Sequence, residues 1–217
     1  MLIEQLHSQP ASTDFHRPHA LKGYQADLSA GSLMIPESRI IAGLMLQRPD
    51  RAAWERALRV DNILQKSSPA TAARQARLIR LRLETIDASA WSSIRNGDKE
   101  IATQLLFAAA LKHSQLLTDF LREVVADHVR RLEDSLSVTA WEPFLHDCAA
   151  RDPSVASWSN STRKKLLQVI IRILAEARYL ETTRSLRLLP PHLHPAVRQS
   201  LLAAGEGQLV SMMEIRA

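Results

Sequence analysis

Side chains that could carry out catalysis or hold a metal are few in this sequence. His192 and His194 stand one residue apart between prolines, a spacing that could ligate a metal ion. Protein zinc sites use three or four ligands, and no third candidate lies nearby, so we expect no metal here. Cys148 is the single cysteine and falls at a core position of a predicted helix. That position is more typical of a small hydrophobic residue than of a nucleophile.

Three carboxylates, Asp119, Glu123 and Asp127, recur every four residues on one predicted helix. Such a row could bind a cation, but a solvated acidic face, or a contact with basic segments of the chain, is the commoner arrangement. The sequence also lacks the GxxxxGK[ST] and GxGxxG patterns that bind nucleotide phosphates. Since no nucleophile, base and oxyanion donor can be assembled, we predict a protein that is not an enzyme and uses no cofactor or small-molecule substrate.

Basic side chains are the chemistry that the composition favours. Lys and Arg number 28 against 23 Asp and Glu, which gives a formal net charge of +5 and an isoelectric point near 9.8. Of the basic residues 22 are arginines, whose planar guanidinium groups suit bidentate contacts with phosphates and bases. The composition is therefore compatible with an acidic partner, although it does not demand one.

The charge is distributed unevenly along the chain. Residues 101–150 contain 4 basic and 7 acidic side chains, whereas residues 151–200 contain 9 basic and 3 acidic ones. Between positions 62 and 83 there are 5 basic residues and no acidic one. Two basic segments thus flank an acidic middle.

The chain contains few glycines, and its prolines separate segments with helical periodicity. This pattern predicts a mainly α fold, a helical bundle with short turns. We predict a flexible N-terminal lead-in at residues 1–22 and an N-terminal helix-turn-helix-like unit at residues 23–95. A central helical hairpin is expected at residues 96–136. The remaining residues, 137–217, are expected to form a C-terminal winged-helix-like unit.

Local signals predict where the helices of the two outer units begin. The expected N-caps are Asp50, Thr139 and either Asn160 or Ser161, and the third N-terminal helix is expected to open at Ser67, Ser68 and Pro69. Thr139 with Glu142 three residues later has the spacing of a capping box. After the last long helix the 3.6-residue period is lost at residues 179–189, where a short β-hairpin would supply the wing.

The third helix of each outer unit has an apolar face and an opposite basic face. In the N-terminal unit, Arg74 and Arg77 lie opposite the line of apolar residues, with Arg80 and Arg82 on the flanks. In the C-terminal unit the side chains that face away from the apolar stripe are Lys164, Lys165, Gln168 and Arg172. Arg163 falls closer to the core edge.

These features are typical of the recognition helix of a helix-turn-helix protein. The first turn of such a helix offers free N–H groups to a phosphate, and Arg or Gln reach base edges in the major groove. The alternative is a pair of ordinary solvated helix faces. The predicted DNA-binding residues are Lys66, Ser67, Ser68, Thr71, Arg74 and Arg77, together with Thr162, Arg163, Lys164, Lys165, Gln168, Arg172, Arg184 and Arg187.

The longest apolar run, Leu105 to Leu111, is far shorter than the roughly 20 residues that span a bilayer. We therefore expect a cytoplasmic protein without a membrane partner. Two alternatives to duplex DNA binding stay open. One is an adaptor that holds other proteins through its apolar and acidic central helices, and the other is RNA binding, for which few exposed aromatic residues are available.

Three stretches together resemble the BrxA family, accessory proteins of bacteriophage exclusion (BREX) defence systems. They are Tyr24 to Ile41 (YQADLSAGSLMIPESRII), Asp61 to Leu83 (DNILQKSSPATAARQARLIRLRL) and Leu111 to Val125 (LKHSQLLTDFLREVV). The resemblance extends from about Tyr24 to the final helical segment. Because long strings recur in the same order, it is specific.

The resemblance implies a helical protein with helix-turn-helix elements that binds double-stranded DNA without catalysis. It also implies other BREX proteins as possible partners, from an operon shared with a DNA methyltransferase, an ATPase, a phosphatase-like protein and a Lon-like protease. Members of the family have been labelled inner-membrane proteins, but the hydropathy of this chain argues against that label. The family has no established catalytic motif to transfer to these residues.

Overall fold

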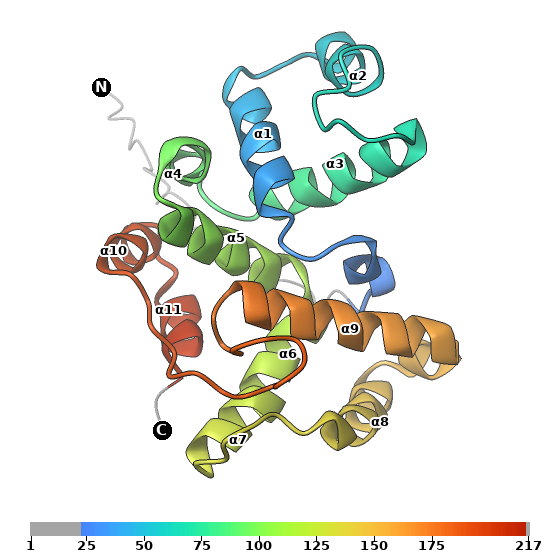
Figure 1. Ribbon diagram of the computed structural model, residues 1–217, viewed down its shortest axis with the longest axis vertical. Helices are drawn as coiled ribbons and strands as arrows, with labels where there is room; N and C mark the ends of the chain where they lie inside the picture. Colours follow the sequence, from blue (N-terminus) through green and yellow to red (C-terminus); the bar gives the residue numbers. More distant parts are fainter. Residues whose placement is uncertain (1–22, 216–217) are drawn as a thin grey trace, which may run out of the picture.

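The computed structural model describes residues 23–215, and the predicted lead-in at residues 1–22 lies outside them. The described chain is mainly helical, as predicted, and contains no β-strand longer than an isolated bridge. Its helices are layered along the long axis (Figure 1). The N-terminal helices lie at one end and the C-terminal basic helix and its neighbours lie toward the other. The first helical arm of the central segment lies between them, and its second arm runs on to the far end.

Three helices of the N-terminal unit form where the sequence predicts them. They are α1 (Ile35–Leu46), α2 (Arg51–Arg59) and α3 (Pro69–Leu83). The Asp50 side chain accepts a 2.7 Å hydrogen bond from the Ala53 N–H and caps α2. Ser68 caps α3 in the same way, because its hydroxyl accepts from the N–H of Thr71 at 3.4 Å.

A fourth helix, α4 (Ser89–Asn96), was not predicted. It packs against α1, and its C-terminal end is held by Arg39, whose guanidinium donates to the carbonyls of Ile94 and Gly97. The buried pair Ala90 and Ile94, one helical turn apart, was the local signal for this element.

The central segment, for which a helical hairpin was predicted, consists of two helical arms that contact each other next to their junction at Ser114. Its first arm is α5 (Lys99–His113). Its second arm is continuous through α6 (Gln115–Asp119), a π-helical turn (Phe120–Val125) and α7 (Ala126–Arg130). The Ser114 hydroxyl accepts from the Leu117 N–H at 3.3 Å and caps the second arm.

The C-terminal unit differs from prediction at both expected caps. A short 3-10 turn (Val138–Ala140) leads into α8 (Trp141–Arg151), and Ser137, not Thr139, accepts the capping bond. The capping box of Thr139 and Glu142 is therefore wrong, because the 3-10 turn moves the helix start past Thr139. A second 3-10 turn, η4 (Pro153–Ser157), precedes α9 (Asn160–Glu176).

The N-cap of α9 is Ser159, one residue before Asn160 and two before Ser161, the two predicted candidates. Its hydroxyl accepts from the Thr162 N–H at 3.2 Å, which is the usual spacing from N-cap to N3. The predicted hairpin after α9 is reduced to one antiparallel bridge between Leu180 and Leu188. A second bridge joins Ser135, in the segment between α7 and α8, to Arg187.

Two further helices, α10 (Pro195–Ala203) and α11 (Gly207–Glu214), close the chain against the central hairpin. The Gln104 side chain of α5 donates to the carbonyl of His192 at 3.0 Å and accepts from the N–H of His194 at 2.8 Å. Gln104 therefore fixes the segment that leads into α10.

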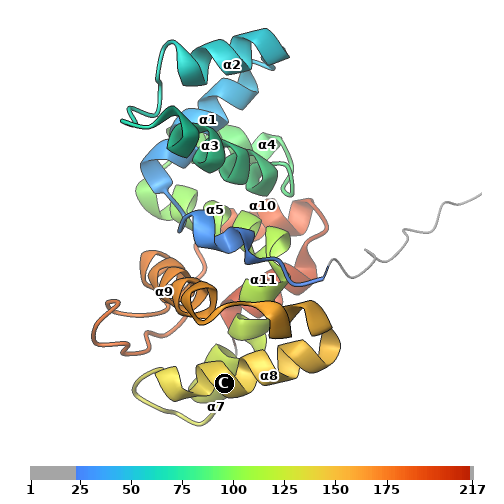
Figure 2. The ribbon, with the colours of Figure 1, turned by 90° about the vertical axis from the view of Figure 1, so that its right-hand side faces the viewer.

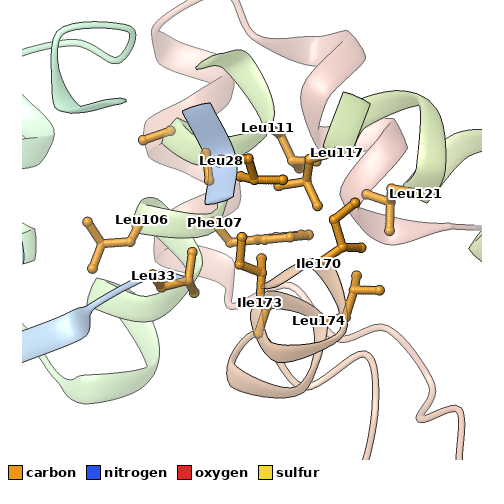
Figure 3. Close-up of a cluster of buried hydrophobic side chains, with 14 of the residues drawn as sticks. Leu28, Leu33, Leu106, Phe107, Leu111, Leu117, Leu121, Ile170, Ile173 and Leu174 are labelled. Carbon is orange, nitrogen blue, oxygen red and sulfur yellow. The ribbon is translucent and has the colours of Figure 1, made fainter. Parts of the chain in front are cut away.

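One hydrophobic core runs through all of these units. Figure 3 shows Leu28 and Leu33, from the N-terminal segment, meeting Phe107 of α5 and both Ile170 and Ile173 of α9. All five side chains are essentially fully buried. Burying one such side chain contributes about 2 kcal/mol, so this cluster holds the N-terminal segment, α5 and α9 together.

Candidate nucleic-acid interface

The apolar and basic faces of α3 lie as the helical projection predicts. Ala72, Ala76 and Ile79 are buried in the core, while Arg74 and Arg77 are exposed. Among the described residues, neither arginine has an ion-pair partner. Both guanidinium groups are therefore free to meet an external anion.

The residues that precede α3 and form its first turn are partly used within the protein. The Lys66 ammonium donates to the Glu37 carboxylate at 2.6 Å, and this contact holds the pKa of Glu37 below its ordinary value although partial burial opposes the change. Ser68 acts as the N-cap and Thr71 is half-buried beside it. Ser67 is exposed. Lys66 is thus the weakest of the predicted contacts, because its charge is already paired.

Arg80 and Arg82, expected on the flanks of the apolar stripe, have different roles. Arg80 is half-exposed, pairs with Glu84 at 2.7 Å and lies over the ring of Trp54. Arg82 is only 3% exposed, so this flank of α3 is covered and the Arg82 charge does not face solvent. Its guanidinium donates to the backbone carbonyls of Gly31 and Ser32, which lie against that side of α3.

In α9 the predicted outer face is exposed. Lys164, Lys165 and Gln168 are exposed and, within residues 23–215, have no side-chain partner. Arg172 is 69% exposed and lies 3.9 Å from Glu176, a distance that leaves it accessible. Leu166 on the opposite face is fully buried.

Two other predicted residues of the C-terminal unit stabilise the start of α9. The Arg163 guanidinium donates to the carbonyls of Trp158 and Ala156 at 3.2 and 3.3 Å, and it lies 3.5 Å from Glu142. The Thr162 hydroxyl lies 2.9 Å from that of Ser159. Ser159 was not predicted as this cap, and its signal in the sequence is its own residue type, because Ser is among the favoured N-cap residues.

Arg184 and Arg187 lie on an exposed loop after α9. The base of this loop is held to the segment before α8, because Leu136 N–H donates to the Leu186 carbonyl and Leu188 N–H donates to the Asp134 carbonyl, both at 2.9 Å. The two arginines are therefore carried by a loop whose base is fixed.

The helices α3 and α9 have similar directions. In Figure 1 both run from right to left, so their N-terminal ends lie on the same side of the molecule. Figure 2 views the molecule from that side, with α3 above α9. The structure thus brings the N-terminal, positive ends of two long helices toward one side.

The acidic row at positions 119, 123 and 127 is not a uniform solvated face. Asp119 is 2% exposed and accepts hydrogen bonds from Tyr24, Gln115 and Arg122. Glu123 accepts two bonds from Arg151, at 2.6 and 2.8 Å. Asp119 and Glu123 therefore both contact a basic residue of the C-terminal segment, Arg151. Asp127 instead pairs with Arg131 on its own helix.

The other candidate chemical residues have structural contacts. His194 Nδ1 accepts from the N–H of Ala196 and so caps α10. Cys148 is fully buried, and burial raises the pKa of its thiol. In the described part of the chain, no three His, Cys, Asp or Glu side chains converge as a metal site would require. None of the helices of residues 23–215 is long and apolar enough to cross a membrane.

A cavity of about 810 Å³ lies between α5, the end of α9 and the segment before α10. Its polar lining includes Glu100, Gln104, Glu176 and Arg178. Gln104 and Glu176 are both engaged with backbone groups of neighbouring segments. The lining contains carboxylates and cations but no serine or cysteine nucleophile.

Comparison with known proteins gives a consistent match over most of the chain. The family model BrxA matches residues 22–205. A protein of Paramagnetospirillum magneticum, named BREX protein BrxA, is 40% identical over 192 residues, which are 88% of this chain and 96% of that protein. A protein of the same name from Escherichia coli is 40% identical over 193 residues, or 89% and 91% of the two chains.

A solved structure is also similar. The crystal structure of an uncharacterized protein from Magnetospirillum magneticum superimposes with a TM-score of 0.82 at 38% identity. The match covers 89% of this chain and 99% of that chain. The range matched by the family model includes both α3 and α9.

Proposed function

Because this chain belongs to the BrxA family of BREX defence proteins, we propose that it binds double-stranded DNA for that system without catalysing a reaction. The observation that carries the proposal is the pair of exposed basic faces on α3 and α9, whose N-terminal ends lie on one side of the molecule. A duplex carries a dense array of phosphates, which matches two cationic surfaces better than an isolated anion would.

The C-terminal unit is the stronger of the two candidate DNA-binding units. We infer that α8, η4 and α9 act as a winged-helix-like unit, with α9 as the recognition helix and residues 181–187 as the wing. The bridges of Leu180 with Leu188 and of Ser135 with Arg187 support this assignment, because they fix the loop next to α9. Arg184 and Arg187 would then contact the backbone beside the groove that receives α9.

Phosphate contacts account for most of the expected affinity. Lys164 and Lys165 would neutralise phosphates, and the first turn of α9 offers N–H groups to another. Gln168 is the exposed side chain best suited to read a base edge, since Gln pairs bidentately with adenine. With one such residue among several cations, we expect limited sequence discrimination.

The N-terminal unit, through α1, α2 and α3, is proposed as a second helix-turn-helix-like contact. Arg74 and Arg77 are its principal residues, because both are exposed and unpaired within residues 23–215. Lys66 would contribute only if it left Glu37. The central hairpin carries no predicted DNA contact.

An adaptor role is the second candidate function, favoured by the surface between α7 and α8. A groove of about 470 Å³ there is lined by acidic residues that include Asp127, Glu133 and Asp147. Leu132 and Val138, in the segment that links the two helices, are 82% and 50% exposed. An acidic groove with exposed apolar neighbours suits a basic protein segment better than a nucleic acid.

A competition experiment tests the proposed function. Purified protein is bound to labelled random duplex DNA, and unlabelled duplex, single-stranded DNA and RNA of equal length are added as competitors at two salt concentrations. We expect duplex DNA to compete best and affinity to fall as salt rises. Better competition by RNA, or affinity that does not change with salt, would contradict the proposal.

A further inference from the structure

We propose that Arg82 and Glu176 are positioning residues that hold α3 and α9 in a fixed relation, so that both basic faces bind one duplex. The inference rests on the proposed DNA binding but assigns a role to two residues that are not proposed to contact DNA themselves, although Glu176 lies 3.9 Å from Arg172 of the proposed interface. Each lies at or next to the C-terminal end of its helix, away from the N-terminal turns that would meet DNA.

Glu176 joins α9 to the N-terminal segment. Its carboxylate accepts from the Ser32 hydroxyl and from the Leu33 N–H, both at 2.8 Å. The partners are more than 140 residues apart in the chain, so these bonds join elements that only the tertiary fold brings together. One carboxylate thus fixes two consecutive residues of the segment.

Arg82 joins α3 to the same segment from the other side. Its buried guanidinium donates to the carbonyls of Ser32 and Gly31, the latter at 3.0 Å. Burial lowers the pKa of Arg82 to about 10, while the charges of Asp27 and Glu176 act in the opposite direction. Arg82 therefore stays protonated at neutral pH, and Glu176 supplies part of the negative charge that compensates it.

No hydrogen bond or ion pair between residues 23 and 215 links α3 directly to α9. The polar connection between them runs through residues 31–33, which Arg82 holds from α3 and Glu176 from α9. Leu33, which follows Ser32, is buried in the core that Figure 3 shows. The segment is therefore anchored in the interior, and its polar groups set the positions of the two helix ends.

A fixed spacing of two binding surfaces matters because the second contact becomes intramolecular. Its effective concentration depends on geometry and is lost when the two surfaces cannot engage together. We therefore expect loss of Glu176 to reduce the affinity for a duplex long enough to span both helices. Affinity for a duplex that covers only one helix should not change.

The test compares a duplex of about 30 base pairs with one of about 10, roughly one helical turn. The variants are Glu176→Ala, Glu176→Gln, which keeps the shape and one acceptor oxygen, and the control Asp98→Ala. Asp98 is an exposed carboxylate at the α4–α5 junction, so its removal changes the net charge equally without touching residues 31–33 or the wing. Thermal melting verifies the fold of each variant.

For Glu176→Ala we expect at least a tenfold loss of affinity for the long duplex, a change of less than about twofold for the short one, and a shallower salt slope. Glu176→Gln should recover most of the loss, and Asp98→Ala should behave as the unaltered protein. If the Glu176→Ala variant is folded and still binds the long duplex as tightly as the unaltered protein, the inference is wrong. If that variant does not fold, Ser32→Ala replaces it, because this substitution removes one hydrogen bond to Glu176. The expected loss of affinity for the long duplex is then about threefold, and an unchanged affinity overturns the inference.

The two proposals fail in different ways. If the unaltered protein binds neither duplex, the proposed function is wrong and the inference with it. If it binds the long duplex more tightly and Glu176→Ala keeps that advantage, only the positioning role is wrong.

Discussion

The phenol of Tyr24 donates a 2.7 Å hydrogen bond to the buried carboxylate of Asp119, which lies 95 residues further along the chain. Burial and this bond to Asp119 both raise the pKa of the Tyr24 hydroxyl, so it stays protonated and keeps donating. The backbone N–H of Tyr24 also donates to Asp152, at 2.8 Å. One residue thus ties the N-terminal segment to the central hairpin and to the end of α8.

Asp119→Ala should destabilise the protein. The substitution leaves the Tyr24 hydroxyl without its acceptor and removes the carboxylate that Gln115 and Arg122 contact, so we expect the free energy of unfolding to fall by about 2 kcal/mol. Urea denaturation measures it. The control is Asp127→Ala, whose half-exposed pair with Arg131 is expected to contribute less than about 0.5 kcal/mol. Equal stability losses in the two variants would contradict the importance of the Tyr24 bond.

Acidification should weaken the tie between Glu123 and Arg151. Two hydrogen bonds from Arg151 hold the pKa of Glu123 below its ordinary value of 4.5. Because the folded-state pKa is the lower one, the stabilisation is present above the unfolded-state value and is lost as pH falls through the folded-state value. Melting temperatures should therefore drop between about pH 5 and pH 3. Glu123→Gln should show a smaller drop, and an identical pH profile would refute this contribution.

Duplex binding should be strongly salt-dependent. If about six cations contact phosphates, log K should fall with log salt with a slope near −5. Titrations at several salt concentrations measure the slope. A slope near zero would favour the adaptor role over DNA binding.

Charge reversal on α9 should weaken DNA binding without unfolding the protein. Lys164→Glu with Lys165→Glu replaces two exposed cations, so we expect the stability to change by less than about 0.5 kcal/mol per site. Affinity should fall at least tenfold at low salt, and the salt slope should become shallower by about 2. The matched control is Arg95→Glu with Lys99→Glu, which makes the same charge change at the α4–α5 junction, on the left in Figure 1. An equal loss in the control would show that only net charge matters.

The corresponding change on α3, Arg74→Glu with Arg77→Glu, tests the second contact. If both basic faces bind one duplex, this variant should also lose affinity for a long duplex and show a shallower salt slope. Circular dichroism and melting verify its fold. If affinity is lost only in the α9 variant, α9 alone reads DNA and the basic face of α3 is a solvated or partner-binding surface.

Local sequence signals predicted α3 and α9 and their faces well, although they missed α4, α10 and α11. The apolar period of α3 and α9 separated buried Ala76 and Leu166 from exposed Arg77 and Lys165. Asp50 was recognised as an N-cap, and the start of α3 was placed at Ser67 to Pro69. These properties depend on residues within a few positions of one another, so a single sequence contains enough information to infer them.

The same local signals failed where a side chain has a distant partner. Arg82 looked like a surface cation, yet it is buried against Gly31 and Ser32, about 50 residues earlier. Lys66 forms an ion pair with Glu37, and the Asp119 carboxylate accepts a hydrogen bond from the Tyr24 hydroxyl. Helical periodicity places a side chain on a face of its own helix but carries no information about what covers that face.

The sequence by itself determined that the chain is helical, which faces of α3 and α9 are basic, and that it resembles the BrxA family. Only the tertiary structure decided which charges remain free for a ligand and how the two basic helices are placed. The physical reason lies in contacts such as that of Glu176 with Leu33, which form between residues 143 positions apart. Such contacts arise only when the core around Leu33 and Ile173 has packed, because desolvation and geometry, not residue type, select the partner of each charge.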